Sequence, residues 1–264
     1  MHSALGGRQV EIVVQSTILP ERIIENVEAS FARDTPRFSN LPNLGKSTGP
    51  VAIVGGGPSL RHEIDNLKVF PGPIIGCGSS HDFLIENKIP LTYHVNCDPE
   101  PIITKWFTKP QFGIIYLIAS QCHPDLFEAL DLCHVRMWHA TVIMAATNKA
   151  LCDFRGEPEI PGADFVVGRA WPIAAVMGHK DIHFYGFDCS FPPDCESQHA
   201  YPYDWTKEEP VYVTIEHTGE RFATVPGWIS QLNNFMKMLA MSGGQFQITI
   251  HGESLAASMC CKSR

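Results

Sequence analysis

A glycine-rich turn is the part of the chain whose residue types and spacing point most directly to chemistry. Residues 51–54 read Val-Ala-Ile-Val, and the sequence continues Gly55-Gly56-Gly57-Pro58-Ser59-Leu60. The apolar run predicts a buried strand, and a proline after glycines suits the first position of a helix, where an N–H group would have no partner. The N–H groups at such a turn bind negatively charged groups, usually phosphate. The alternative is a strand–turn–helix corner in which the glycines serve only steric needs.

Small and polar residues also follow other predicted strands, at 78–80 and 96–98. Ligands of open α/β sheets bind beyond the carboxyl ends of the strands, so we expect these residues to share one site with the glycine turn. The predicted nucleotide or donor contacts are Gly55, Gly56, Gly57, Pro58, Ser59, Gly78, Ser79, Ser80, Asn96 and Asp98. The two serines have helix N-capping as their alternative role, and Asp98 has an Asp-Pro turn.

Candidate catalytic residues lie in the second half of the chain. Asp188 follows a predicted strand at 181–186 and faces the same edge of the sheet. A neutral imidazole near pH 7 can deprotonate an acceptor hydroxyl, which makes His199 the favoured base and His217 its competitor. The spacing of Cys189, Cys195 and His199 fits no standard zinc site, so no structural metal is predicted.

Composition limits the class of protein. The 264 residues are 44% hydrophobic and 18% charged, as expected for a globular protein with a large core. No apolar run is long enough for a membrane span, and the first residues lack the apolar segment of a secretory signal. Nine scattered cysteines fit a reducing compartment, so a cytoplasmic location is expected. The net charge of −8 argues mildly against a protein that clamps nucleic acid.

Strands alternate with helices along most of the chain. Strands are expected at 51–54, 73–78, 91–95, 113–119, 134–139, 181–186 and 245–250, with a polar hairpin at 211–215 and 221–224 and an edge strand at 8–15. Helices are expected at 20–32, 59–69, 80–87, 124–129, 169–177 and 228–241. This order predicts an α/β fold with a doubly wound, mostly parallel, Rossmann-like sheet and helices on both faces. Residues 1–49 are interpreted as an N-terminal extension and linker, and residues 50–264 as one catalytic domain.

The glycine turn lacks the spacing of a dinucleotide fingerprint but resembles the Gly-x-Gly-Pro-Ser-Leu opening of the MptE-like family. The stretches 76–80, 94–99 and 178–190, followed by His199-Ala200-Tyr201, are similar to the same pattern, so the resemblance covers residues 50–205. The family includes archaeal 6-hydroxymethylpterin pyrophosphokinases and the motility accessory factors that glycosylate flagellin. The resemblance implies a Rossmann-like transferase that acts on a nucleotide-activated donor.

The turn also resembles that of bacterial sialyltransferases, which use a CMP-sugar. This resemblance implies that Tyr201 or Tyr203 assists departure of the nucleotide phosphate, and His217 falls in the region where those enzymes place their base. Their second turn residue is an asparagine that touches the nucleotide, whereas this chain has Gly56. The contact does not transfer, so CMP is not implied as the nucleotide.

Three functions follow from these observations. The favoured one is a glycosyltransferase that needs no metal and moves a sugar from a nucleotide-sugar to an acceptor hydroxyl on a glycan, a protein or a modified nucleic acid base. The second is a pyrophosphokinase that moves diphosphate from ATP to a hydroxymethylpterin-like compound and binds Mg²⁺ through Asp98 and Asp188. The third is a nucleotide-binding protein without catalytic activity. The sequence predicts no oligomeric state.

Overall fold

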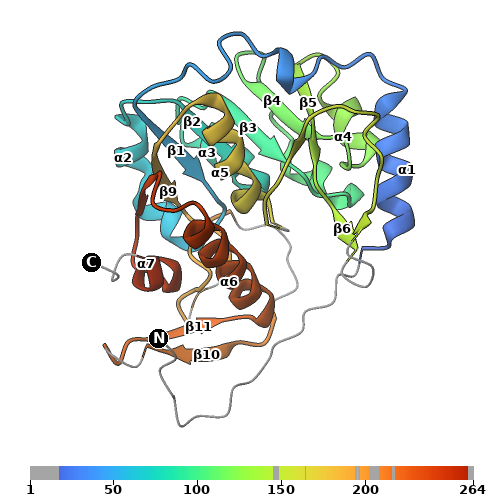
Figure 1. The fold of residues 1–264 in the computed structure, drawn as a ribbon. Coiled ribbons are helices and arrows are strands. Elements are labelled where there is room, and N and C mark those ends of the chain that lie inside the picture. The colour runs from blue at the N-terminus through green and yellow to red at the C-terminus, as the bar shows by residue number, and fades with distance from the viewer. Residues whose placement is uncertain are drawn as a thin grey trace.

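The computed structural model describes residues 18–144, 149–163, 165–193, 195, 197–201, 208–215 and 218–260. Its central strands are β1 (Pro50–Val54), β2 (Ile74–Cys77), β3 (Tyr93–Asn96), β4 (Ile115–Ala119), β5 (His134–Ala140), β8 (Glu159–Ile160), β9 (Asp181–Tyr185) and β12 (Gln247–Ile250). They form one eight-stranded sheet in the order β12-β9-β1-β2-β3-β4-β5-β8, and every neighbouring pair is parallel. The predicted doubly wound, Rossmann-like α/β fold is confirmed (Figure 1).

The strand order reverses beside β1. The chain places β2, β3, β4, β5 and β8 successively on one side of β1, and then returns to place β9 on the other side. Val54 at the end of β1 is paired with Tyr185 at the end of β9. In doubly wound sheets the connections leave the sheet in opposite directions at this point and open a crevice for a ligand.

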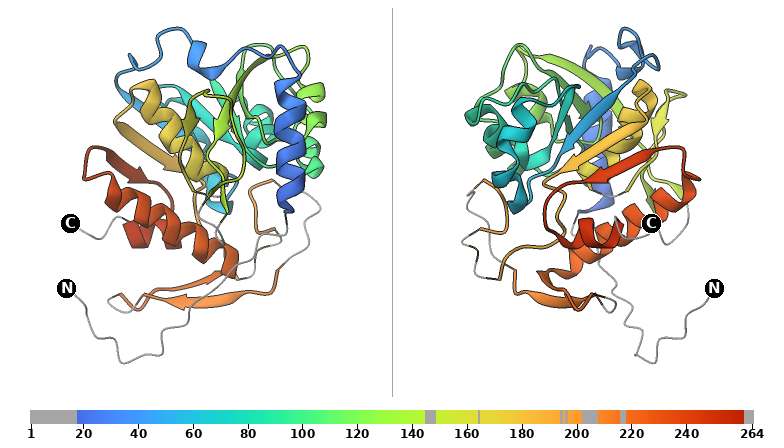
Figure 2. Two further views of the ribbon diagram at one scale, coloured as in Figure 1. Left: turned by 45° about the vertical axis from the view of Figure 1, so that its right-hand side comes forward. Right: turned by 90° about the vertical axis from the view of Figure 1, so that its left-hand side faces the viewer.

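The helices are α1 (Pro20–Phe31), α2 (Ile64–Lys68), α3 (His81–Glu86), α4 (Pro124–Ala129), α5 (Val166–Met177), α6 (Pro226–Met241) and α7 (Leu255–Cys260), with short 3-10 helices at Phe38–Asn40, Pro58–His62, Gly78–Ser80 and Pro101–Trp106. Helices α2 and α3 cover one face of the sheet and α5 covers the other (Figure 2). None of the helices in the described ranges has the length and apolar character needed to cross a bilayer.

Burial explains why strands β1 and β2 are uniformly apolar. All four residues of 51–54 are fully buried, as are Ile74 and Ile75 in the neighbouring strand. Parallel strands covered by helices on both faces need apolar side chains on both sides, so alternation is lost. Helix α5 ends at Met177 and is capped by Gly178, whose φ of 108° lies in the left-handed region that favours glycine.

Several elements differ from the sequence-based prediction. The helix expected at 59–69 is divided into the 3-10 helix Pro58–His62 and α2, and α5 begins at Val166, three residues before the predicted start. The 3-10 helix Pro101–Trp106, strand β8, helix α7 and the small hairpin β6 (Ile143–Met144) with β7 (Lys149–Ala150) were not predicted. The strand expected at 8–15 lies outside the described residues.

The polar hairpin is present as β10 (Val211–Thr214) paired antiparallel with β11 (Arg221–Thr224). It forms its own two-stranded sheet, on the side of α6 away from α5 (Figure 1). It is fixed by a small apolar cluster of Phe191, Ala223 and Val225, with Trp228 packed against them.

Helix α1 belongs to the segment interpreted as an extension, and its polar side chains bind the ends of the central strands. Asn26 Nδ2 donates to the carbonyl oxygens of Pro99 and Gln121, at 3.0 and 2.9 Å. The Ser30 hydroxyl donates to the Ser120 carbonyl at 2.7 Å. The division into 1–49 and 50–264 stays a prediction, but α1 contributes directly to the carboxyl edge of the sheet.

Candidate functional site

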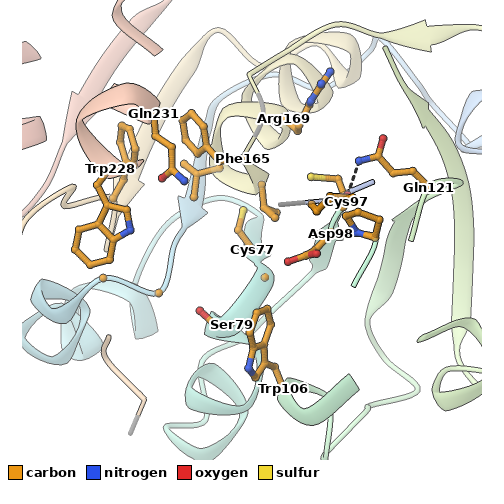
Figure 3. A pocket seen from close by; sticks show the side chains of 18 of the residues that line it. Cys77, Ser79, Cys97, Asp98, Trp106, Gln121, Phe165, Arg169, Trp228 and Gln231 are labelled. Atoms are coloured by element: carbon orange, nitrogen blue, oxygen red, sulfur yellow. Dashed lines mark hydrogen bonds between the residues drawn. The ribbon is translucent and has the colours of Figure 1, made fainter. Parts of the chain in front are cut away.

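A cavity of about 670 Å³ lies at the carboxyl edge of the sheet, where the strand order reverses. We call it the first cavity. Its wall contains residues that follow β1, β2, β3 and β9, together with the first turn of α5 and parts of α1 and α6. Figure 3 shows Asp98 and Gln121 on one side of this space and Trp228 and Gln231 on the other. Of the predicted contacts, Gly56, Gly57, Gly78, Ser79 and Asp98 line the first cavity, as do the predicted catalytic residues Asp188 and His199.

The glycine turn is held tightly against the end of β9. The Gly55 N–H donates to the Tyr185 carbonyl and the Gly57 N–H donates to the Gly186 carbonyl, both at 2.8 Å. A Cβ atom on Gly55 would lie 2.6 Å from the Gly186 carbonyl oxygen, and one on Gly57 would lie 2.6 Å from Asp188 Oδ2. Two of the three glycine N–H groups are therefore bonded within the protein, and the close approach of the two strand ends requires glycine.

Ser59 and Asp188 are joined by two short hydrogen bonds in this region. The Ser59 N–H donates to Asp188 Oδ2 at 2.7 Å, and the Ser59 hydroxyl donates to Oδ1 at 2.6 Å. The Asp188 residue is only 4% exposed. Burial raises the pKa of its carboxyl to about 6, against the opposing effect of the two bonds from Ser59. Asp188 is therefore a carboxylate that takes up a proton close to neutral pH.

His199 faces the first cavity and its segment is tied to the glycine turn. The Ala200 N–H donates to the Gly56 carbonyl at 2.8 Å, and the Arg61 guanidinium donates to the carbonyl oxygens of His199 and Ala200. The imidazole meets the Trp228 ring edge-on, with the centroids 5.7 Å apart. Burial lowers the pKa of His199 to about 4, so the ring is neutral at physiological pH.

The end of β3 places a second carboxylate in the wall. Asp98 turns its side chain into the first cavity (Figure 3), while its Oδ1 accepts from the Glu100 N–H at 3.0 Å. Burial raises the pKa of Asp98 above its ordinary value. The neighbouring Asn96 is fully buried and does not line the cavity; its Oδ1 accepts from the Asp98 N–H. Asn96 therefore braces Asp98 in this structure.

Other predicted site residues lie away from the first cavity. The Ser80 hydroxyl is buried, donating to the Val54 carbonyl and accepting from the Cys77 N–H, each at 3.0 Å. Tyr201 donates its hydroxyl to Glu86 at 2.8 Å and is not part of the wall. Gly55 and Pro58 also lie outside the wall, although they shape the turn. His217 and Tyr203 lie outside the described residues.

Several wall residues were not predicted as ligand contacts: Cys77, Cys97, Trp106, Gln121, Phe165, Arg169, Trp228 and Gln231. Trp106 ends a 3-10 helix that has no periodic pattern, and Phe165 precedes a helix that the sequence places later. Arg169 offers the clearest signal in the sequence, since it is a charge within an apolar helix. It is buried and donates to the carbonyl oxygens of Ile160 and Thr141, at 3.2 and 2.8 Å.

The fold and the position of the first cavity define a doubly wound α/β protein with a ligand site at the reversal of strand order. The model of the family described as 6-hydroxymethylpterin diphosphokinase MptE-like matches residues 21–194, and the chain belongs to this family. The resemblance found in the sequence is therefore confirmed. No curated protein sequence matches the chain.

Among solved structures, the chain is similar to the MAf glycosyltransferase from Magnetospirillum magneticum AMB-1, with a TM-score of 0.65 and 15% identity. The match covers 90% of this chain but 39% of that chain, so our sequence spans well under half the length of this neighbour. At this level of identity the likeness shows a shared fold.

Proposed function

We propose that this protein is a transferase that moves a sugar from a nucleotide-activated donor, bound in the first cavity, to an acceptor hydroxyl. A diphosphokinase and a glycosyltransferase are both transferases, and these are the activities named for the family and for the structural neighbour. The observation that carries the proposal is Asp188, a buried carboxylate on the wall of the cavity with a pKa of about 6. A base of this strength beside a ligand cavity suits proton removal from a hydroxyl group.

The wall of the first cavity has one part suited to the phosphates of such a donor and another part suited to its rings. Gly56 and Ser79 provide backbone and hydroxyl groups at the strand ends, where phosphate groups bind in folds of this kind. Trp106 and Trp228 add aromatic surfaces on which a sugar or a base can pack. We place the phosphates beside the glycine turn and the transferred sugar toward Asp188.

In this proposal Asp188 acts as the general base. The acceptor oxygen forms a bond to the donor carbon as its proton passes to the Asp188 carboxylate, and the bond from that carbon to the phosphate oxygen breaks with its electron pair. The sequence favours His199 for this role, and that assignment stays a prediction. The pKa of about 6 at Asp188 lies closer to neutral pH than the pKa of about 4 at His199, so Asp188 is the better matched base. The neutral His199 ring bonds the Gly56 backbone and so helps to hold the glycine turn beside the phosphates. No cofactor besides the donor is needed.

A panel of nucleotide-sugars tests the proposal. The wild-type protein is incubated separately with CMP-, UDP-, GDP- and ADP-linked sugars, with and without Mg²⁺, and its melting temperature is measured. A ligand present at about 100 times its Kd stabilises the folded state by roughly 2.7 kcal/mol, which is several degrees for most domains. One responding nucleotide class, with slow release of free nucleotide from it, would support the proposal. No response to any nucleotide-sugar would overturn it, and binding without release would favour the non-catalytic alternative.

The diphosphokinase activity is a second candidate, favoured by the Asp98 carboxylate on the cavity wall and by the description of the family. Mg²⁺ is commonly held by one or two carboxylates together with the phosphates of the substrate. Asp98 fits this role because only its Oδ1 is bonded to the backbone, whereas both oxygens of Asp188 accept bonds from Ser59. The described residues contain no group of three or more His, Cys, Asp or Glu side chains arranged around a metal. Bound Mg²⁺ would neutralise phosphate charge in this reaction.

AMP release separates the two activities. If the protein is a diphosphokinase, ATP with Mg²⁺ and a hydroxymethylpterin yields AMP, and Asp98→Asn removes that yield. Nucleotide release from a nucleotide-sugar without any AMP from ATP would leave glycosyl transfer as the activity.

A further inference from the structure

A second cavity, of about 710 Å³, lies on the other side of the glycine turn. Its wall is built from the 3-10 helix Pro58–His62, the segment 190–193, strand β11 and the loop after β12. Gly57 lines the first cavity, whereas Pro58 and Ser59 line the second. Among the described residues, Asp188 is the one that belongs to both walls. The chain from Gly57 to Ser59 therefore separates two spaces that meet at a single carboxylate.

We propose that this second cavity binds a neutral saccharide, which presents the acceptor hydroxyl to Ser59 and Asp188. The inference rests on the glycosyl transfer proposed above and names the acceptor class for it. A transferase needs separate places for donor and acceptor, with the base within reach of the acceptor oxygen. The second cavity meets that need because its wall carries both members of the Ser59–Asp188 pair.

Ser59 is held so that its hydroxyl faces a fixed direction. Its proton is donated to Asp188 Oδ1 at 2.6 Å, and its oxygen keeps lone pairs for another donor. On the far side, a Cβ atom at Gly252 would lie 2.8 Å from the Ser59 Oγ atom, so the loop after β12 closes against the hydroxyl. A hydroxyl group of a ligand that donates to Ser59 would thus stand one hydrogen bond away from the Asp188 carboxylate.

The second cavity carries charges of both signs. Arg61 and Arg221 provide donors, while Glu63, Glu253 and Asp188 provide carboxylates. Arg61 is held in place by the carbonyl oxygens of residues 199 and 200, and the Arg221 guanidinium lies over the Tyr212 ring, 4.1 Å from its centroid. An anion would meet three carboxylates here and a cation would meet two guanidinium groups. A ligand rich in neutral hydroxyl groups can satisfy both kinds of partner.

The same wall offers apolar surface for the carbon face of a sugar ring. Phe191 and Phe222 line the second cavity together with Pro192 and Pro193. Saccharides bind through such a combination, with C–H groups packed on flat apolar side chains and hydroxyl groups bonded at the ring edge. This combination favours a saccharide over a serine-containing peptide as the acceptor.

Ligand-observed NMR tests the site directly. Maltose, lactose and chitobiose are added in turn to the wild-type protein without nucleotide, and saturation transfer to each sugar is measured. We expect at least one of them to bind, and the double variant Arg221→Gln/Glu253→Gln to bind it roughly tenfold more weakly, as the loss of charged hydrogen bonds predicts. Asp98→Asn, in the first cavity, serves as the matched control and should leave saccharide affinity unchanged.

Three results would overturn the inference: no saccharide binds, the control weakens binding as much as the double variant, or a serine-containing peptide binds in place of the sugars. Because the measurement uses no nucleotide, its result does not depend on whether the proposed donor binds. If a saccharide binds but no nucleotide-sugar raises the melting temperature, the saccharide site is supported and the proposed nucleotide-sugar donor is overturned.

Discussion

The Asp188 carboxylate accepts both the backbone N–H and the hydroxyl of Ser59, at 2.7 and 2.6 Å, across 129 residues of sequence. The pair joins the residues after β9 to the first turn after β1. It also explains a serine in the Gly-Pro-Ser turn, since a short hydroxyl side chain at 59 supplies the second bond. The predictions below start from this pair.

Replacing Asp188 by asparagine should lower both turnover and stability. The amide would place an N–H donor against one of the two donors of Ser59, and a buried donor without an acceptor costs about 1–3 kcal/mol. Urea unfolding measures the loss of stability, and nucleotide release from the responding nucleotide-sugar measures the loss of activity. Ser59→Ala is the matched control, because it removes one hydrogen bond without creating an opposed donor, and should cost about 1 kcal/mol. A stable, fully active Asp188→Asn protein would contradict the proposed role.

The pH dependence of catalysis should identify the base. If Asp188 removes the proton, kcat/KM falls about tenfold per pH unit below the pKa of about 6 and levels off above it. If His199 is the base, the fall in kcat/KM would begin near pH 4 instead. The rate of nucleotide release, measured between pH 4 and 8 at fixed ionic strength, shows at which of these two pH values the activity begins to fall.

The pH dependence of the unfolding free energy should also depend on Asp188. The pKa of Asp188 rises from its ordinary value of 3.8 to about 6 on folding, so the folded protein keeps this proton to higher pH than the unfolded chain. Its contribution to the free energy of unfolding is therefore complete below about pH 4 and is lost as the pH rises through about 6. A rise of this size corresponds to roughly 3 kcal/mol. The difference in unfolding free energy between wild type and Asp188→Asn should decline across this window; a constant difference would show that burial does not raise the pKa.

Gly57 should resist substitution for a steric reason. A Cβ atom there would lie 2.6 Å from Asp188 Oδ2 and 2.7 Å from the Gly186 carbonyl oxygen, too close without movement of the backbone. We expect Gly57→Ala to destabilise the protein by about 1–3 kcal/mol. Gly227→Ala in the first turn of α6 has no atom within 4 Å of the new Cβ and should be neutral or slightly stabilising. Equal melting temperatures for the two variants would argue against the close packing of the turn.

His199→Ala tests the histidine that the sequence favours. The variant should lower turnover while leaving nucleotide-sugar binding largely intact, since the phosphates are placed at the glycine turn. Initial rates and the melting-temperature shift with the donor, measured on the same preparation, separate the two effects. Full activity in this variant would remove His199 from the mechanism.

The parts of the fold that depend on continuous apolar runs could be predicted from the sequence. The strand at 51–54 is buried on both faces, and a run of apolar residues ending in glycine has few other interpretations. Helix α4 was predicted with its observed bounds because Pro124 marks its first position. The short elements were missed because two-residue strands such as β8 carry no periodic pattern.

The candidate site was predictable only in outline. Strand ends converge by topology, which brought Gly56, Ser79 and Asp98 to the same cavity. Which atoms face the ligand depends on partners far away in sequence: Ser59 was assigned to a nucleotide, but its donors bind Asp188. The protonation state of a buried side chain also depends on residues that are distant in sequence. No local pattern reveals that burial lowers the pKa of His199 to about 4.

The pairing of β1 with β9 has a consequence for how the protein folds. Strands β1 to β5 follow one another with short connections, whereas β9 must return to β1 after more than a hundred residues. Closing a loop of this length costs entropy before the contacts it brings can repay it, so non-local pairings of this kind form slowly. We therefore expect the ligand cavity to be assembled in the last stage of folding. During that interval one edge of the apolar strand β1 would have unpaired backbone groups, which makes this edge the place where aggregation and productive folding compete.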